Sequence, residues 1–205
     1  MIRRRTALAL SAVALLAAAP ALTACGATAH PGAAAVVGHD RITVSEVQRQ
    51  VADVREAQRS SPQAQQPAAN GARLGQDTLV RLIQYRIVEK AGEDNGIGTA
   101  RRELQEQRLR IDRANGGAEA VQARFLALGI APDQIERALT VELVRTKLDA
   151  KFGAERTNAI LTRTSEKLRV DVNPRYGTWD ARRGTTGPAR EPWLRATPPL
   201  GERPA

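Results

Sequence analysis

Glycine divides the middle of this chain into segments in which apolar residues recur with the period of an α-helix. Gly96, the pair Gly116 and Gly117, Gly129 and Gly153 each follow such a segment, and a glycine just beyond a helix favours the left-handed conformation that ends it. Two of these glycines are followed by Ile, the apolar residue that often accompanies this kind of helix end. Because every apolar stripe needs a partner, the pattern predicts a set of short helices packed on one another.

The stripes predict a mainly α-helical domain from about Val36 to Val172, with a multi-helix architecture. Between the first two helices, the stretch from Ser60 to Gly75 is rich in Pro and Gln and predicts a loop. The predicted helices start at Thr43, run over Gln76–Asn95, Thr99–Asn115 and Ala118–Leu128, extend from Pro132 to Gly153, and end in a stretch that carries Ile160, Leu161 and Leu168.

The first helix has the clearest local signal. Thr43-Val44-Ser45-Glu46 fits a capping box, in which the Thr43 hydroxyl accepts from the Glu46 N–H and the Glu46 carboxylate accepts from the Thr43 N–H. Ile42 and Val47 occupy the two positions of the apolar contact that accompanies such a box. The helix should therefore begin at Thr43.

Short β-prone runs lie at both ends of the predicted helical domain. The first is Val36 to Ile42 and the second is Val170 to Val172, after which Pro174 prevents a helix from continuing. Two such runs could pair and close the domain. The remainder, 173–205, consists of an Asn-Pro-Arg-Tyr-Gly segment and a Pro- and Arg-rich tail that we expect to be largely disordered.

The start of the chain has the layout of an export signal. Arg3, Arg4 and Arg5 precede an uncharged stretch of small and apolar residues that is too short and too rich in Ala to favour a permanent membrane span. The stretch ends in Leu-Thr-Ala-Cys, which resembles a bacterial lipobox. We expect residues 1–24 to be removed by cleavage after Ala24, Cys25 to carry the lipid, and residues 25–35 to act as a flexible tether. The protein is then held at the extracytoplasmic face of the cell membrane.

The net charge is divided along the chain. The formal charge of +9 falls to +6 once the three arginines of the signal are removed. Of the 31 basic residues all but four are Arg, a bias that GC-rich codon usage produces together with many Ala. Acidic and basic residues alternate along most of the predicted helices, so a concentrated basic patch is not expected. Export also argues against a nucleic-acid partner.

Several of these segments resemble the SurA N-terminal chaperone domain. The segment with which the predicted domain begins, Ala35 to Glu46, is similar to the start of that domain. The segment Leu79 to Ile97 is similar to its second helix, and the segment Gly129 to Leu148 is similar to the start of a later helix. The 173–177 segment resembles the point at which SurA-like and PrsA-like foldases of Gram-positive bacteria leave the chaperone domain, and the composition suggests an actinobacterium. The resemblance implies a fold related to the peptide-binding domain of trigger factor.

The resemblance does not extend to catalysis. Many such foldases carry a parvulin-type prolyl isomerase domain, but only 28 residues follow Gly177, with no His after His39 and no Cys after Cys25. We therefore expect no isomerase activity and no enzyme. His30 and His39 are the only histidines and lie in the tether and in a predicted turn, so we expect no catalytic residues, no metal site and no cofactor.

The function that these observations favour is a lipid-anchored holdase for unfolded or assembling exported proteins. A helical cradle with a broad apolar surface can hold exposed apolar segments without ATP. The alternative is a non-catalytic assembly lipoprotein with one specific membrane or cell-wall partner, and the oligomeric state is open. For each candidate residue of the client-binding surface taken singly, an ordinary core position is the more common alternative, because helical stripes usually pack internally. The candidates are Leu82, Tyr85, Phe125, Leu128 and Leu139.

Overall fold

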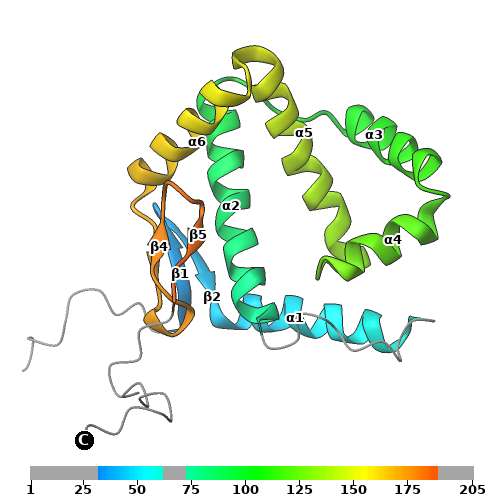
Figure 1. The fold of residues 1–205 in the computed structure, drawn as a ribbon, viewed down its shortest axis with the longest axis horizontal. Coiled ribbons are helices and arrows are strands. Elements are labelled where there is room, and N and C mark those ends of the chain that lie inside the picture. Colours follow the sequence, from blue (N-terminus) through cyan, green and yellow to red (C-terminus); the bar gives the residue numbers. More distant parts are fainter. Residues whose placement is uncertain (1–31, 62–72, 189–205) are drawn as a thin grey trace, which may run out of the picture. The chain divides into compact units, whose positions relative to one another are not determined.

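The computed structural model describes residues 32–61 and 73–188 (Figure 1). The predicted signal, Cys25, His30 and most of the tether lie outside the described residues, as does the stretch 189–205 of the predicted tail. Six α-helices and two small antiparallel sheets make up the described part. The prediction of a mainly α-helical fold is therefore confirmed.

The helices begin and end close to the predicted positions. The largest difference is at Pro132, where a 3-10 turn precedes the fifth helix instead of continuing it. The helices are α1 (Val44–Arg59), α2 (Leu74–Asp94), α3 (Arg101–Ala114), α4 (Ala118–Ala127), α5 (Ile135–Phe152) and α6 (Ala154–Leu168), with 3-10 turns at Pro132–Gln134 and Pro174–Tyr176. The strands are β1 (Ala33–Val37), β2 (Asp40–Thr43), β3 (Asp171–Val172), β4 (Trp179–Asp180) and β5 (Thr185–Thr186).

The two ends of the helical region pair as expected. Strand β3 pairs antiparallel with one edge of β1, with Ala35 opposite Val172, and β2 pairs with the other edge of β1. The first β-prone run is a hairpin and not one strand, because Gly38 adopts a φ of +63° and reverses the chain between β1 and β2. This sheet joins segments that are far apart in the sequence and closes the helical region.

The capping box at Thr43 is half formed. The Thr43 hydroxyl accepts from the Glu46 N–H at 3.0 Å, as predicted. The reciprocal bond from the Thr43 N–H to the Glu46 carboxylate is absent from the described part of the chain, because Thr43 is the last residue of β2 and pairs with Ala33. Ile42 and Val47 are both buried in the same cluster, so the helix and the strand that precedes it share one core.

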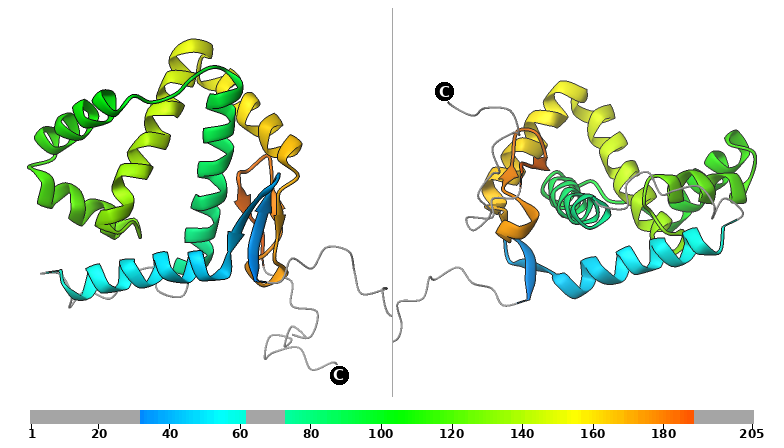
Figure 2. Two further views of the ribbon diagram at one scale, coloured as in Figure 1. Left: turned by 180° about the vertical axis from the view of Figure 1, so that it is seen from behind. Right: turned by 60° about the horizontal axis from the view of Figure 1, so that its bottom comes forward.

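Helix α2 lies at the centre of the described part. It packs against α1, α5 and α6, and Figure 1 and the left view of Figure 2 show it between α5 and α6, with α1 across its lower end. Helices α3 and α4 lie on the far side of α5. The approach of α2 to α5 is close at Gly92, where an added Cβ would lie 2.6 Å from a methyl of Val144.

Three buried clusters form the core. The first joins the three-stranded sheet to α1 and α2, the second joins α2 to α5 and α6, and the third joins α5 to the end of α4. Helix α3 contributes no fully buried residue, and only Leu104 and Ile111 pack against the third cluster. The weakly amphipathic sequence of α3 therefore corresponds to a helix that contacts the core along one narrow face only.

The folded part extends beyond the expected boundary at Val172. Residues 173–188 form a 3-10 turn and the β4–β5 hairpin, and the hairpin is fixed to the helices. The indole N–H of Trp179 donates to the Ser165 hydroxyl at 2.9 Å, and the Gln84 amide donates to the Gly184 carbonyl at 2.8 Å. The Asp180 carboxylate stabilises the turn between β4 and β5 by accepting hydrogen bonds from two backbone N–H groups. The turn is short and polar, so its composition resembles that of a disordered tail and did not predict a hairpin.

Candidate functional site

A groove of about 730 Å³ crosses the middle of α2. Helices α3, α4 and α5 contribute one side of it, and α6 and the β4–β5 hairpin contribute the other. Four residues of α2, Gln84, Tyr85, Ile87 and Val88, lie between these walls. The groove is therefore built by segments from most of the described chain.

Aromatic side chains are concentrated in this groove. The chain has only two Trp, two Tyr and two Phe, and one of each lines the groove: Trp179, Tyr85 and Phe125. All three are half-buried, so part of each ring faces the open space. Large aromatic rings contribute a great deal of apolar contact area at a binding surface. The aliphatic lining includes Ile111, Leu139 and Leu161.

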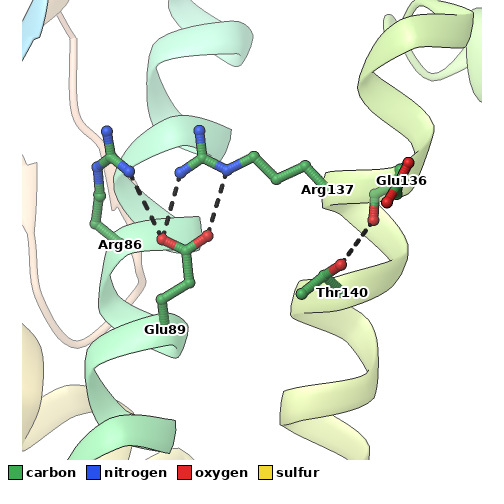
Figure 3. A network of polar contacts seen from close by, with 5 residues as sticks. All are labelled: Arg86, Glu89, Glu136, Arg137 and Thr140. Carbon is green, nitrogen blue, oxygen red and sulfur yellow. Dashed lines mark hydrogen bonds and ion pairs between the residues drawn. The ribbon is translucent and has the colours of Figure 1, made fainter. Parts of the chain in front are cut away.

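A charged network of Arg86, Glu89 and Arg137 joins α2 to α5 beside Tyr85, and Figure 3 shows these three side chains. The guanidinium of Arg137 lies 5.5 Å from the centre of the Tyr85 ring and donates two hydrogen bonds to the carboxylate of Glu89, both at 3.3 Å. Arg86 approaches the same carboxylate at 3.7 Å. Burial is the main reason that the pKa of Tyr85 is raised, so the phenol stays neutral at physiological pH. The network therefore holds the Arg137 guanidinium against the Tyr85 ring, which lines the groove.

Other polar contacts hold the walls in place. Arg81 of α2 donates to the Gly129 carbonyl at 2.6 Å, just after α4, and burial lowers the pKa of its guanidinium. Arg145 of α5 donates to the Asn158 side chain of α6 at 2.8 Å. These bonds, together with those from Gln84 and Trp179, tie every wall of the groove to a neighbouring element.

The structure separates the five predicted client-binding residues into three kinds of position. Tyr85, Phe125 and Leu139 all line the groove, although Leu139 is only 3% exposed. Leu82 is 1% exposed and belongs to the first core cluster, so its side chain is not accessible in this structure. Leu128 is 63% exposed but does not line the groove.

Sequence reasoning missed the α6 and β4–β5 wall. Leu161 was predicted to be helical but not to line a surface, and Trp179 was placed in a tail. The signal that could have identified Trp179 is its isolation: a single Trp directly after the 173–177 segment, in a chain with few aromatic residues. A large aromatic residue there requires something to pack against.

The described residues hold neither a metal site nor a membrane span. No three or more His, Cys, Asp or Glu side chains of residues 32–61 and 73–188 lie together in a way that could bind a metal ion. No helix within those ranges combines the length and the apolar character that crossing a membrane requires.

Residues 1–149 match a family model described as a SurA-like N-terminal domain. No curated protein and no solved structure matches the chain. The matched region ends near the end of α5, so β3 lies beyond it, as do α6 and the β4–β5 hairpin, which form one wall of the groove.

Proposed function

The chain belongs to the family of SurA-like N-terminal domains, and from this premise we propose that it is a holdase for unfolded or assembling exported proteins. A domain of this family suggests a chaperone-like role and is itself non-catalytic. The observation that carries the proposal is the groove, because three half-buried aromatic residues and several aliphatic residues line it. Exposed apolar surface of this kind in a soluble domain marks an interaction site.

The chemistry of the groove suits segments of unfolded chains. A groove of several hundred Å³ with mostly apolar walls is of the size in which proteins hold ligands and peptide side chains. Contact with aromatic rings depends on area and not on one pattern of hydrogen bonds, so many different apolar segments can bind. Release needs no ATP, because a client that folds buries its own apolar residues and withdraws them from the groove.

Replacing Tyr85 by alanine should weaken the holdase activity. The purified chain is expected to suppress the aggregation of a denatured client, measured by light scattering, and Tyr85→Ala should require several times more protein for the same suppression. Phe152→Ala is the matched control, because Phe152 is also half-buried and does not line the groove. Its ring also contacts a cationic side chain, with Lys151 Nζ 5.2 Å from the ring centre. This control should leave the suppression unchanged.

Two results would count against the holdase proposal. The absence of any suppression by the unchanged protein at a twofold molar excess would exclude the activity itself. Equal losses in Tyr85→Ala and Phe152→Ala would show that the groove is not the binding surface. Circular dichroism of both variants separates a loss of binding from a loss of folding.

We also propose that the protein is anchored by lipid to the extracytoplasmic face of the cell membrane. The support is in the sequence: a positive start, an uncharged stretch and Leu-Thr-Ala-Cys in the order of a lipoprotein signal. In this proposal residues 1–24 are removed, Cys25 carries the acyl chains and 25–35 tether the domain. Two or three acyl chains hold a protein on a bilayer without a spanning helix.

Replacing Cys25 by serine should release the protein from the membrane. Cell fractionation is expected to find the natural chain with the membranes and Cys25→Ser in the soluble extracytoplasmic fraction. Mass spectrometry of the natural chain should find a diacylglyceryl group on Cys25 and a new N-terminus at that residue. The control is Thr23→Ser, which keeps the cysteine. A mature natural chain in which Cys25 carries no lipid would contradict the proposed anchor.

A further inference from the structure

The groove has a basic rim. Its charged lining consists of four arginines and one glutamate, Glu142 of α5. Arg124 comes from α4, Arg145 from α5, and Arg182 and Arg183 from the turn between β4 and β5. The helices carry alternating charges along the sequence, so this concentration is a product of the fold.

Two of the four arginines are compensated by carboxylates. The Nε of Arg145 lies 4.0 Å from Asp149, and the Nε of Arg183 lies 3.7 Å from Asp180. Both pairs are within one helix turn or one tight turn and are partly exposed, so each neutralises its arginine locally.

The other two arginines have no acidic partner among the described residues. Arg124 donates to the neutral amide oxygen of Asn115 at 2.8 Å. Arg182 uses its backbone N–H on Asp180, and no described carboxylate pairs with its guanidinium. Both side chains are exposed. The free positive charge of the rim therefore belongs to Arg124 and Arg182.

These two charges lie on opposite walls. Figures 1 and 2 place α4 on one side of α2 and the β4–β5 hairpin on the other, and the apolar lining of Tyr85, Leu139 and Leu161 lies between them. An extended chain that crosses the groove would meet a positive charge, then apolar surface, then a second positive charge.

We propose that the preferred occupant is a peptide segment with an apolar centre and an Asp or Glu on each side of it. This inference rests on the proposed holdase function and names the client class for the same groove. The apolar centre provides most of the affinity, while the flanking carboxylates pair with Arg124 and Arg182. Charge complementarity of this kind selects partners and speeds encounter more than it adds affinity.

The same arrangement discriminates against basic segments. A client with Lys or Arg at the flanking positions would bring like charges together on both walls, which disfavours binding. Glu142 is the only acidic side chain among the lining residues and lies on a wall that Arg145 also occupies. The groove therefore selects by charge at its ends and by apolar contact at its centre.

The test compares three fluorescent peptides that share one apolar centre and differ only at two flanking positions: Asp, Asn or Lys. With the purified full chain at low salt, the Asp peptide should bind about tenfold more tightly than the Lys peptide, with the Asn peptide between them. The difference should shrink in about 0.5 M salt, where the screening length falls to roughly 4 Å.

The double variant Arg124→Gln/Arg182→Gln should abolish this preference, so that it binds the Asp and Lys peptides with similar affinity. The matched control is Arg49→Gln/Arg110→Gln, which removes the same charge from two exposed arginines of α1 and α3 outside the groove. The control should keep most of the preference. A preference that falls equally in both variants would overturn the role of the rim, because it would then follow net charge alone.

The remaining outcomes separate this inference from the proposed function. Equal binding of all three peptides would overturn the acidic preference and leave the holdase intact. Failure of every peptide to bind would contradict the holdase itself. Saturable binding of vesicles that contain phosphatidylglycerol, lost in Arg124→Gln/Arg182→Gln while the peptides do not bind, would show that the rim recognises lipid and would overturn the proposal.

Discussion

Replacing Leu82 by alanine is expected to lower the free energy of unfolding by about 2–5 kcal/mol. The side chain is 1% exposed and lies in the core cluster that joins α2 to α1 and the three-stranded sheet. The shorter side chain leaves a cavity in the core. Leu79 and Ile83 are both fully buried and packed in place, so they cannot shift far enough to fill it. Urea unfolding followed by circular dichroism measures the change.

Leu128→Ala is the matched control for that experiment. The same atoms are removed from a side chain that is 63% exposed and lies outside the groove, so the change should stay within about 0.5 kcal/mol. The contrast tests the assignment of Leu82 to the core. A Leu82→Ala protein with unchanged stability and weakened client binding would contradict this assignment and restore Leu82 to the binding surface.

The helices could be predicted because their ends are encoded locally. Gly96 and Gly129 adopt φ values of +68° and +72°, and the N–H of the Ile after each donates back to a carbonyl of the helix that has just ended, at 2.8 and 3.0 Å. Such an end depends on two or three adjacent residues. The pairing of β1 with β3 could be anticipated for a related reason, since both runs flank the helical region and need a partner.

The binding surface could be predicted only in part, because it depends on which neighbour covers each side of α2. The apolar residues of this helix extend around most of its circumference, as it packs against α1, α5 and α6. Leu82 and Tyr85 are three residues apart, yet one faces the core and the other the groove. Periodicity identifies the apolar stripe but not the gap between the helices that cover it.

The concentration of arginines around the groove could not be predicted from the sequence either, because it depends on which elements the fold brings together. Arg124 and Arg182 lie on elements far apart in the sequence, and each has an acidic residue a few positions before it, Glu119 and Asp180. Only the return of the β4–β5 hairpin to α2, through Gln84 and Gly184, brings both to the same groove. Alternating charge along a helix therefore does not exclude a basic site that is assembled from several elements.

Replacing Gly177 by alanine is expected to detach the β4–β5 hairpin from the helices. Gly177 has a φ of +103°, which disfavours any residue with a side chain, and an added Cβ would lie 2.2 Å from the carbonyl oxygen of Gly187. That oxygen belongs to the backbone, so no side-chain rotation relieves the contact. The bond from the Gly187 N–H to the Thr178 carbonyl, at 2.8 Å, lies beside it and should break.

The loss of the hairpin can be followed through Trp179. In a Trp193→Phe background, Trp179 is the only remaining tryptophan of the chain, so its emission should shift to the wavelength of a solvated indole when its bond to Ser165 is lost. Peptide binding should weaken at the same time, because Trp179 and Arg182 form part of one wall of the groove. The helices should remain folded, since β1 still pairs with β2 and β3.

Gly184→Ala separates the effect of the contact from the effect of the backbone conformation. Gly184 also has a positive φ, of +63°, but nothing lies within 4 Å of an added Cβ. It should therefore cost only about 1–2 kcal/mol of backbone strain and leave the emission of Trp179 unchanged. If Gly177→Ala left that emission unchanged as well, the hairpin would not depend on the close approach of the two backbones. If Gly177→Ala shifted the emission of Trp179 without weakening peptide binding, the hairpin would not be a wall of the functional groove.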